Sequence, residues 1–371
     1  MDVIAIIQSS LLTPLILFFI LGIVATRIKS DLKIPDAISE FLPIYLLAVI
    51  GLHGGLEMRK MGFDNMIIPI FVAVGLSIAM TMNHYQILKR LGKFNIFDSY
   101  AIAAAYGSVG ATSFSVGLSF LKTQNQQSEG FMAVILAVLE PVSLILCVFL
   151  VNMSITKSQK KSKHYETKQV LEDVKQVPND DSIAVEIGEV HDETSMKQVL
   201  QNTIAGKAIV ILLGAIIIGY VIRESGFQSI KLGFEDLFFP ALVIFLIEMG
   251  IITGQKLEDV KKAGKFLIIF SVAVPTFNGI VGVVVSTYIG LSIGGSVLLG
   301  LLFASASFIA APSVLRTAIR KANPGLYITS ALGITFPFNM IVLLPAMFIL
   351  STILHNPGTL DLSSYFGEGL K

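Results

Sequence analysis

A carboxylate stands in the middle of a long apolar segment of this 371-residue chain. Glu140 is preceded by Val-Ile-Leu-Ala-Val-Leu and followed by Pro-Val-Ser-Leu-Ile-Leu. Placing a charged side chain at the centre of a bilayer costs at least ~2.5–3.5 kcal/mol on insertion scales, so such a group should face a cavity or a partner. We expect Glu140 to bind a cation or to carry a proton. A buried hydrogen bond to a neighbouring helix is the structural alternative.

A cluster of small and hydroxylated residues interrupts the apolar segment 98–121. Its members are Gly107, Ser108, Gly110, Thr112 and Ser113. An unpaired backbone group in hydrocarbon costs several kcal/mol, so a helix break survives only where protein or a water-filled cavity satisfies it. Such a break offers N–H groups to an anion, and carbonyls and hydroxyls to a cation. Close packing is the alternative, because small residues also line ordinary helix contacts in membranes.

A matching interruption follows about 197 residues later, in the apolar segment 300–318. The residues that break it are Ser305, Ser307 and Pro312. Prolines repeat at nearly the same spacing in two pairs, Pro43 with Pro240 and Pro141 with Pro337. Paired breaks at matched positions are hard to explain by packing alone. They favour a binding site between the two breaks, which Thr335 could help to complete.

The elements that must position these residues are membrane helices. The chain is 54% hydrophobic and 14% charged, against roughly 45–50% and 25% in soluble domains. Ten apolar segments are long enough to span a hydrocarbon core of ~30 Å: 11–27, 36–52, 66–82, 98–121, 129–152, 203–222, 236–253, 265–289, 293–318 and 325–353. We therefore predict an all-α polytopic membrane protein.

The repeated pattern divides the chain into two halves of five spans each. An odd number of spans forces the halves to insert with opposite orientations, giving an inverted 5+5 repeat whose two discontinuous helices cross. We expect the first repeat over 1–153, a linker over 154–201, the second repeat over 202–354 and a tail over 355–371. Most of the Lys and Arg residues fall on one face, which the positive-inside bias assigns to the cytoplasm. The linker should then be cytoplasmic and both termini extracytoplasmic.

The linker mixes many acidic residues with lysines and has few aromatics. That composition buries too little apolar surface to fold alone, so we expect a flexible tether. The alternating run 182–190 is the exception, and a strand on a partner is the alternative there.

Several classes of function are unsupported by the sequence. A net charge of +1 without a basic, aromatic-rich cluster gives no footprint for nucleic acid. The single cysteine, Cys147, lies in a predicted span and has no partner for an intramolecular disulfide. Metal-ligand spacings, nucleotide-binding loops and nucleophile arrangements are missing from the sequence. We therefore expect no catalytic residues and no metal centre, and an ion gradient is the plausible energy source.

Four stretches of the chain resemble the SbtA-type sodium-dependent bicarbonate transporter family. They are IPDAISEFLPIYLLAVIGLHGGLEMRK (34–60), GSVGATSFSVGLSFL (107–121), VLEPVSLILCVFLVN (138–152) and SASFIAAPSVLRTAIRKANPGLYITSALG (305–333). The resemblance implies gate and core domains in an inverted 5+5 repeat, and sodium-coupled bicarbonate uptake across a bacterial plasma membrane. It also implies a homotrimer and, in some systems, a cytoplasmic PII-like regulatory protein.

The resemblance carries over to residues by position. It places Gly107, Ser108, Gly110, Thr112 and Ser113 in the first crossover, and Ser305, Ser307 and Pro312 in the second. Glu140 stands where relatives have Asp. Phe308 stands where the family pattern Ser-Ser-Ser-Asp-Ile-Ser-Gly-Pro-Pro has its acid, so one candidate sodium ligand is missing from this chain.

These observations together favour a secondary transporter of a small anion, bicarbonate by resemblance, with Na⁺ as the coupling ion. The expected substrate-binding residues are Gly107, Ser108, Gly110, Thr112, Ser113, Ser305, Ser307 and Thr335, and the expected cation-binding residues are Glu140, Ser108 and Ser307. Two alternatives stay open: transport of a different anion or coupling to protons, and a membrane sensor or scaffold that does not transport and recruits a partner through the linker.

Overall fold

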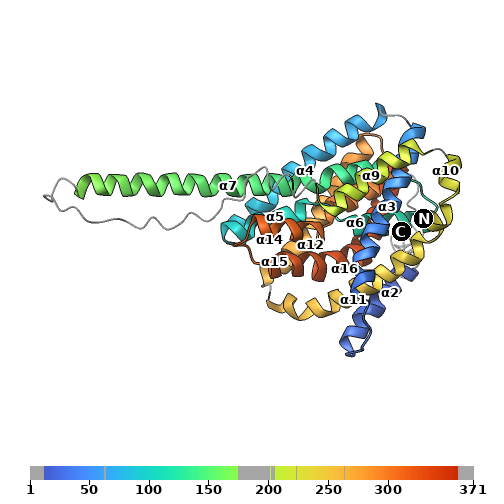
Figure 1. The fold of residues 1–371 in the computed structure, drawn as a ribbon, viewed down its shortest axis with the longest axis horizontal. Coiled ribbons are helices and arrows are strands. Elements are labelled where there is room, and N and C mark those ends of the chain that lie inside the picture. Colours follow the sequence, from blue (N-terminus) through green and yellow to red (C-terminus); the bar gives the residue numbers. More distant parts are fainter. Residues whose placement is uncertain are drawn as a thin grey trace, which may run out of the picture.

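The computed structural model describes residues 12–61, 64–173, 201, 205–222, 224–262 and 264–357, and these residues form helices joined by short connections (Figure 1). In this part of the chain, seven helical stretches are long and apolar enough to cross a membrane: Asp36–Lys60, Asn65–Arg90, Ile96–Thr123, Met132–Ser154, Leu232–Leu257, Lys265–Tyr288 and Pro324–His355. Three further apolar helices are shorter: Pro14–Arg27, Lys207–Val221 and Ile293–Ala304. The prediction of an all-helical polytopic protein is confirmed for the part of the chain that is described.

The helices of the first half, in chain order, are α2 (Pro14–Arg27), α3 (Asp36–Met61), α4 (Asp64–Arg90), α5 (Ile96–Gly107), α6 (Ala111–Thr123) and α7 (Met132–Asp173). Those of the second half are α9 (Lys207–Val221), α10 (Glu224–Gln228), the π-helical turn η1 (Leu232–Asp236), α11 (Phe238–Lys262), α12 (Lys265–Tyr288), α13 (Ile293–Ala304) and α14 (Ala310–Ala318). The last predicted span comprises α15 (Pro324–Ser330), η2 (Ala331–Thr335), α16 (Phe336–Phe338), η3 (Asn339–Leu343) and α17 (Leu344–His355).

The last span is less regular than its apolar sequence predicts. Pro337 and Pro345 have no backbone N–H, so each removes one i→i−4 bond from an α-helix. The π-helical turns η2 and η3 precede these two prolines. Widening of the helix by one residue per turn accommodates the lost donors.

Helix α7 is longer than the predicted fifth span. It continues to Asp173, about 20 residues beyond the expected end of the first repeat, and projects away from the body of the protein (Figure 1). The predicted linker therefore begins with a helix. The alternating run 182–190 and most of the predicted tail lie outside the described residues, and the flexibility of the linker stays a prediction.

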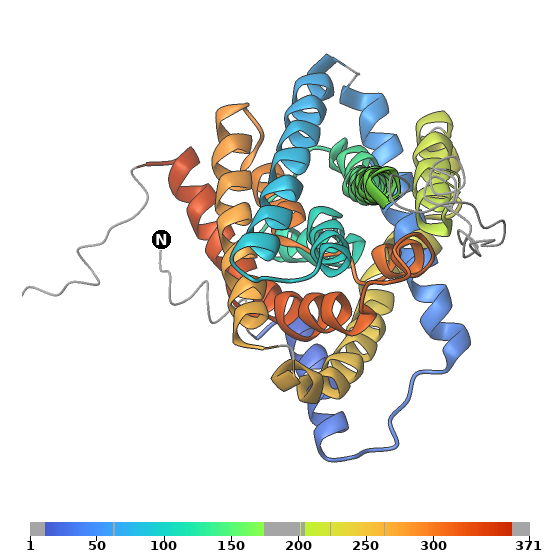
Figure 2. The same ribbon diagram turned by 90° about the vertical axis from the view of Figure 1, so that its left-hand side faces the viewer.

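Two pairs of helices join the halves of the chain along their length. Helix α2 packs against α11, and α3 packs against α9 (Figure 2). Glycines permit this close approach: a Cβ at Gly22 would lie 2.2 Å from the carbonyl oxygen of Ile247, and one at Gly55 would lie 2.1 Å from that of Ile216. Each pair therefore meets backbone to backbone, as small residues allow in membranes.

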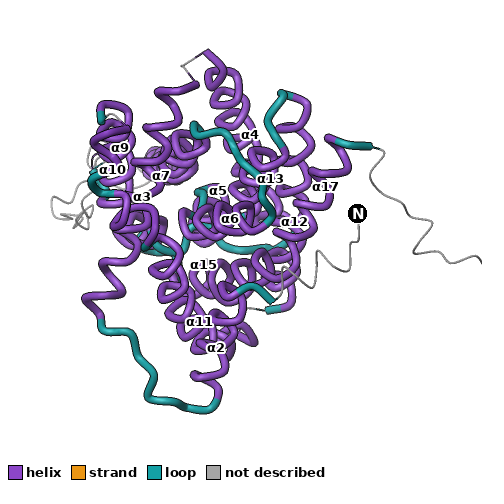
Figure 3. Tube along the Cα trace, turned by 90° about the vertical axis from the view of Figure 1, so that its right-hand side faces the viewer, coloured by secondary structure: helices purple, strands orange, loops and turns teal. Residues whose placement is uncertain are grey.

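The broken helix of the first half lies at the centre of the bundle. Figure 3 shows α5 and α6 surrounded by the other helices. Within Ile96–Thr123, 83% of the most apolar 18-residue window is buried, against 28% for Asn65–Arg90. Most of a membrane helix at the rim faces lipid, so this burial places the first break in the protein interior.

Candidate binding site at the two helix breaks

The two breaks have the same local construction. Helices α5 and α13 each contain 12 residues, and each is capped at its start by a side chain, that of Asn95 for α5 and that of Ser292 for α13. Each ends at a serine with extended backbone, Ser108 (φ −82°, ψ 134°) and Ser305 (φ −80°, ψ 161°). The breaks expected from the sequence are therefore present, at equivalent places.

Hydrogen bonds hold the two breaks against each other. The amide of Gly110 donates to Oγ of Ser305 at 2.8 Å, and the amide of Ser307 donates to the carbonyl of Ala105 at 2.8 Å. The Ser305 hydroxyl in turn donates to the carbonyl of Leu302 at 2.7 Å. Protein groups thus satisfy part of the backbone that the breaks expose, as burial in a membrane requires.

Side chains of neighbouring helices cap the carbonyl ends of α5 and α13. Oγ of Ser143 donates to the carbonyl of Ala104 at 3.1 Å. Nδ2 of Asn339 donates to the carbonyl of Ala304 at 2.8 Å, and Nδ2 of Asn278 to that of Phe303 at 3.2 Å. The carbonyls that the sequence suggested as cation ligands therefore already accept hydrogen bonds from the protein.

The amide ends of the two following helices differ. Helix α6 begins after Gly110, which has no side chain to cap it. At the start of α14, the amide of Ala311 donates to Oγ of Ser307 at 3.1 Å, and Pro312 has no amide to donate. The first turn of α6 is therefore the better equipped of the two to receive an anion.

A cavity of about 120 Å³ lies beside the breaks, bounded also by α3, α7, α9 and α11. Four of the predicted site residues line it: Gly110, Thr112, Glu140 and Ser307. Three polar residues that sequence reasoning missed line it as well: Ser115, Lys207 and Ser313. Lys207 opens an apolar segment and looks like an ordinary interfacial lysine, so only the packing of α9 against α3 reveals its place.

Glu140 is buried beside the breaks, with 3% of its surface exposed. Its carboxylate oxygen Oε2 has no hydrogen-bond partner among the described residues, while its main-chain carbonyl accepts a bond from Oγ of Ser108 at 2.9 Å. A buried carboxylate without a partner is strongly unfavourable unless it takes up a proton or a cation. Of the two roles expected for Glu140, ligand or structural hydrogen bond, the geometry favours the first.

The remaining predicted residues lie off the cavity wall. Gly107 packs against Thr81, whose Oγ1 would lie 2.0 Å from a Cβ at that position. Ser108 and Ser305 hold the breaks through the hydrogen bonds described above, and Ser113 is buried. Thr335 belongs to a separate buried network, in which it bonds with the hydroxyl of Tyr106 at 2.7 Å and donates to the carbonyl of Ser271 at 2.8 Å.

An aromatic column begins at Phe308, which lines the cavity. The ring of Phe308, at the second break, meets that of Phe336 edge to face with centroids 5.3 Å apart. Phe336 meets Phe19 of α2 in the same way at 5.6 Å. The position that carries an acid in the family pattern is therefore occupied here by part of an apolar contact between the break and α2.

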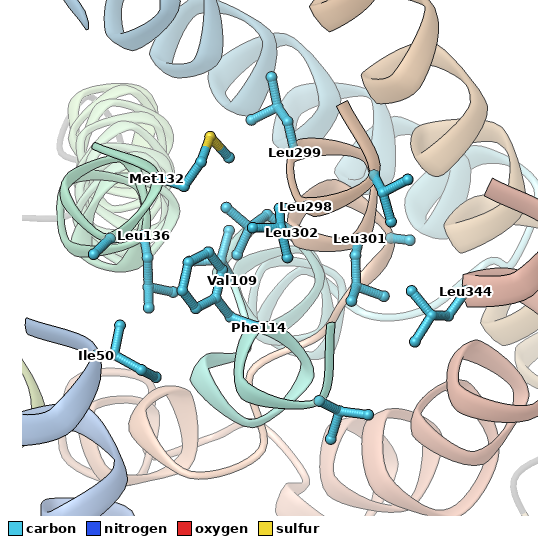
Figure 4. Packing of buried hydrophobic residues seen from close by; sticks show 14 of the residues in the cluster. Ile50, Val109, Phe114, Met132, Leu136, Leu298, Leu299, Leu301, Leu302 and Leu344 are labelled. Atoms are coloured by element: carbon cyan, nitrogen blue, oxygen red, sulfur yellow. The ribbon is translucent and has the colours of Figure 1, made fainter. Parts of the chain in front are cut away.

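A second cavity, of about 320 Å³, lies toward the other end of α6. Its charged lining residues are Glu57, Lys122, Glu129 and Glu235, with His53 beside them. On α3, residues Pro43–Leu47 line the first cavity, whereas the stretch from Val49 to Glu57 lines the second. Buried apolar side chains, among them Ile50, Phe114 and Leu136, pack together here (Figure 4). Ile50 and Phe114 of this cluster also line the second cavity.

Comparison with known proteins agrees with the resemblance noted in the sequence. A family model described as the Na⁺-dependent bicarbonate transporter superfamily matches residues 14–352. None of the curated proteins compared with the chain matches it. The match covers both halves of the chain, including the two breaks, Glu140 and the cavity between them. The chain belongs to the Na⁺-dependent bicarbonate transporter superfamily.

Proposed function

We propose that this membrane transporter carries bicarbonate through the cavity beside the two breaks, with Na⁺ as the coupling ion. The observation that carries the proposal is the juxtaposition of two helix breaks joined by hydrogen bonds, the uncapped start of α6 and the unpartnered carboxylate of Glu140 around one cavity. Broken helices of this kind serve ion and substrate binding in secondary transporters.

The anion is held at the start of α6 in this proposal. The helix dipole and the first amides of α6 favour negative charge, and the hydroxyls of Thr112 and Ser307 line the same space. Gly110 allows the anion to approach the backbone. Toward the anion the remaining predicted residues take indirect roles, because they fix the backbone around the breaks or lie in the neighbouring network: Gly107, Ser108, Ser113, Ser305 and Thr335.

The cation is held by Glu140, with the hydroxyls of Ser108 and Ser307 as neutral ligands. A hard cation such as Na⁺ suits oxygen ligands, and its charge offsets a carboxylate that the protein leaves unpaired. Phe308 supplies no second carboxylate, so the site has a single acidic ligand. One cation bound per anion is the stoichiometry that follows.

An inverted 5+5 repeat is the architecture that we propose for the ten helical segments. The packing supports it, because α2 packs against α11 and α3 against α9. The first span of each half therefore lies against the second span of the other half. Loop anchors are reciprocal too. The carboxylate of Asp98 in α5 accepts from the amide of Asn323 at 2.7 Å, and that of Glu129 accepts from the amide of Ser292 before α13 at 2.6 Å.

The family resemblance supports the remaining proposals. These are a homotrimer in a bacterial plasma membrane, a cytoplasmic linker with extracytoplasmic termini, and a PII-like partner. Such a partner would bind the linker at the long extension of α7, and its binding would regulate transport.

Uptake of labelled bicarbonate into proteoliposomes tests the proposal. An inward Na⁺ gradient should drive accumulation above equilibrium, and a K⁺ gradient of equal size should not. Accumulation driven by a pH gradient without Na⁺ would replace Na⁺ by protons as the coupling ion. Absence of uptake in every arm would contradict the proposed transport and favour a role as sensor or scaffold.

A further inference from the structure

The cavity beside the breaks carries two ionisable side chains, which come from different helices. Glu140 projects from α7, and Lys207 is the first residue of α9. The other lining residues are apolar or carry hydroxyl groups, apart from backbone amides at the breaks. The charge of the cavity is therefore set by one buried carboxylate and one lysine.

Lys207 is the solvent-exposed member of this pair. It follows Gly206 at the start of α9 and is exposed, whereas Glu140 is buried at the breaks. Among the residues that the structure describes, no carboxylate lies within 4.0 Å of its ammonium group. Its charge is not neutralised by a described neighbour and acts on whatever enters the cavity.

The walls of the cavity strengthen the effect of that charge. Pro43, Leu47 and Phe245 contribute apolar surface to the cavity that Lys207 and the breaks line. Low-dielectric walls focus the field of a charge at the mouth of a cleft, which raises the local concentration of oppositely charged solutes. An ammonium group also donates up to three hydrogen bonds and accepts none, so it suits oxyanions.

We propose that Lys207 is the residue that admits anions to the cavity and selects small oxyanions with one negative charge. One ammonium balances one negative charge, and a dianion would bring a second negative charge toward Glu140. The proposal rests on the cavity being the route of the transported anion. The charge selectivity of the cavity can nevertheless be measured without transport.

An interfacial anchor is the competing role for Lys207, and the chain contains a matched control for it. Lys265 is the first residue of α12, follows Gly264, and is exposed, but it does not line the cavity. Both lysines occupy the first position of an apolar helix. Replacement by Gln removes the charge from either position and keeps a long polar side chain.

The test uses a cysteine reporter inside the cavity of the full-length protein. Ser313 lines the cavity from α14 and is exposed, so Ser313→Cys should be tolerated, and Ala310→Cys provides a second reporter. Cys147 is buried, and labelling of the unmodified protein gives the background. Rates of reaction with anionic and cationic methanethiosulfonates are measured with Lys207, with Lys207→Gln and with Lys265→Gln.

The ratio of anionic to cationic rates should fall about tenfold in Lys207→Gln, because the focused charge is lost, and should stay unchanged in Lys265→Gln. Lys207→Arg should keep the ratio. An unchanged ratio in Lys207→Gln, or an equal fall in both Gln variants, would overturn the proposal. If the rates behave as expected and wild-type protein transports no bicarbonate, the proposed function fails while the role of Lys207 stands.

Discussion

The hydroxyl of Ser305 accepts a hydrogen bond from the amide of Gly110 at 2.8 Å, which joins two helix breaks 195 residues apart in sequence. Gly110 lines the cavity, and Ser305, which is 1% exposed, lies behind the cavity wall. The bond therefore links the break of the first half directly to the break of the second half. The contribution of this hydrogen bond to the stability of the protein can be measured directly.

Ser305→Ala should destabilise the protein by ~1–3 kcal/mol, because it leaves a buried amide without its acceptor. Thermal unfolding of the purified protein in detergent, followed by circular dichroism, measures the change. Ser229→Ala serves as the control, since that hydroxyl is exposed, and its effect should stay within about 0.5 kcal/mol. Equal stability of the two variants would show that the link between the two breaks does not depend on Ser305.

Glu140→Gln should abolish the dependence of uptake on Na⁺, because the amide is close in size and carries no charge to attract the cation. Glu140→Asp should retain the dependence with a weaker apparent affinity, since its arm is shorter. Glu248→Gln is the matched control, as Glu248 lies in the apolar span of α11 and does not line the cavity. Uptake by Glu140→Gln with normal Na⁺ dependence would remove this residue from the cation site.

Phe308→Asp should steepen the dependence of uptake on Na⁺ from a Hill coefficient of about one to a value above one. The substitution adds a second carboxylate beside Glu140 and so creates a second cation ligand of the kind that hard cations prefer. Phe308→Asn is the control, because it removes the ring without adding charge. A steeper curve in both variants would mean that the loss of the ring, rather than the new charge, changes coupling.

Gly219→Ala should lower stability by at least ~1–3 kcal/mol, the usual effect of overpacking. A Cβ at this position of α9 would lie 2.2 Å from the carbonyl oxygen of Leu52 in α3. Gly214→Ala on the same helix meets no atom within 4 Å, and should be neutral or stabilising by up to about 1 kcal/mol. The midpoint of thermal unfolding in detergent compares the stability of the two variants. A Gly219→Ala variant that is more stable than Gly214→Ala would contradict the close packing of α3 on α9.

The sequence predicted the places of the two breaks, because Gly, Ser and Pro interrupt otherwise apolar segments at matched spacing. It also singled out Glu140, since a carboxylate in an apolar span is expensive and conspicuous. Both signals are local, so they can be recognised in a single sequence. The family assignment agreed with the comparison over residues 14–352.

Long-range packing could not be predicted in the same way. Nothing in the sequence around Thr335 indicated the buried network that its side chain forms with Tyr106 and Ser271. Lys207 looked like an interfacial anchor but lines the cavity, because α9 packs against α3. The π-helical turns beside Pro337 and Pro345 could not be predicted either. The missing N–H of a proline indicates that the helix is irregular, but it does not determine whether the irregularity is a kink, a break or a π-helical turn.

Binding of bicarbonate to the purified protein, measured by calorimetry in Na⁺ and in K⁺, tests the central claim most directly. If anion and cation share the cavity beside the breaks, Na⁺ should raise the affinity for bicarbonate, and bicarbonate should raise the affinity for Na⁺ by the same factor, as linkage requires. Glu140→Gln should remove this coupling and leave weak binding of the anion. Affinity for bicarbonate that is the same in both salts, and the same in Glu140→Gln, would contradict the account.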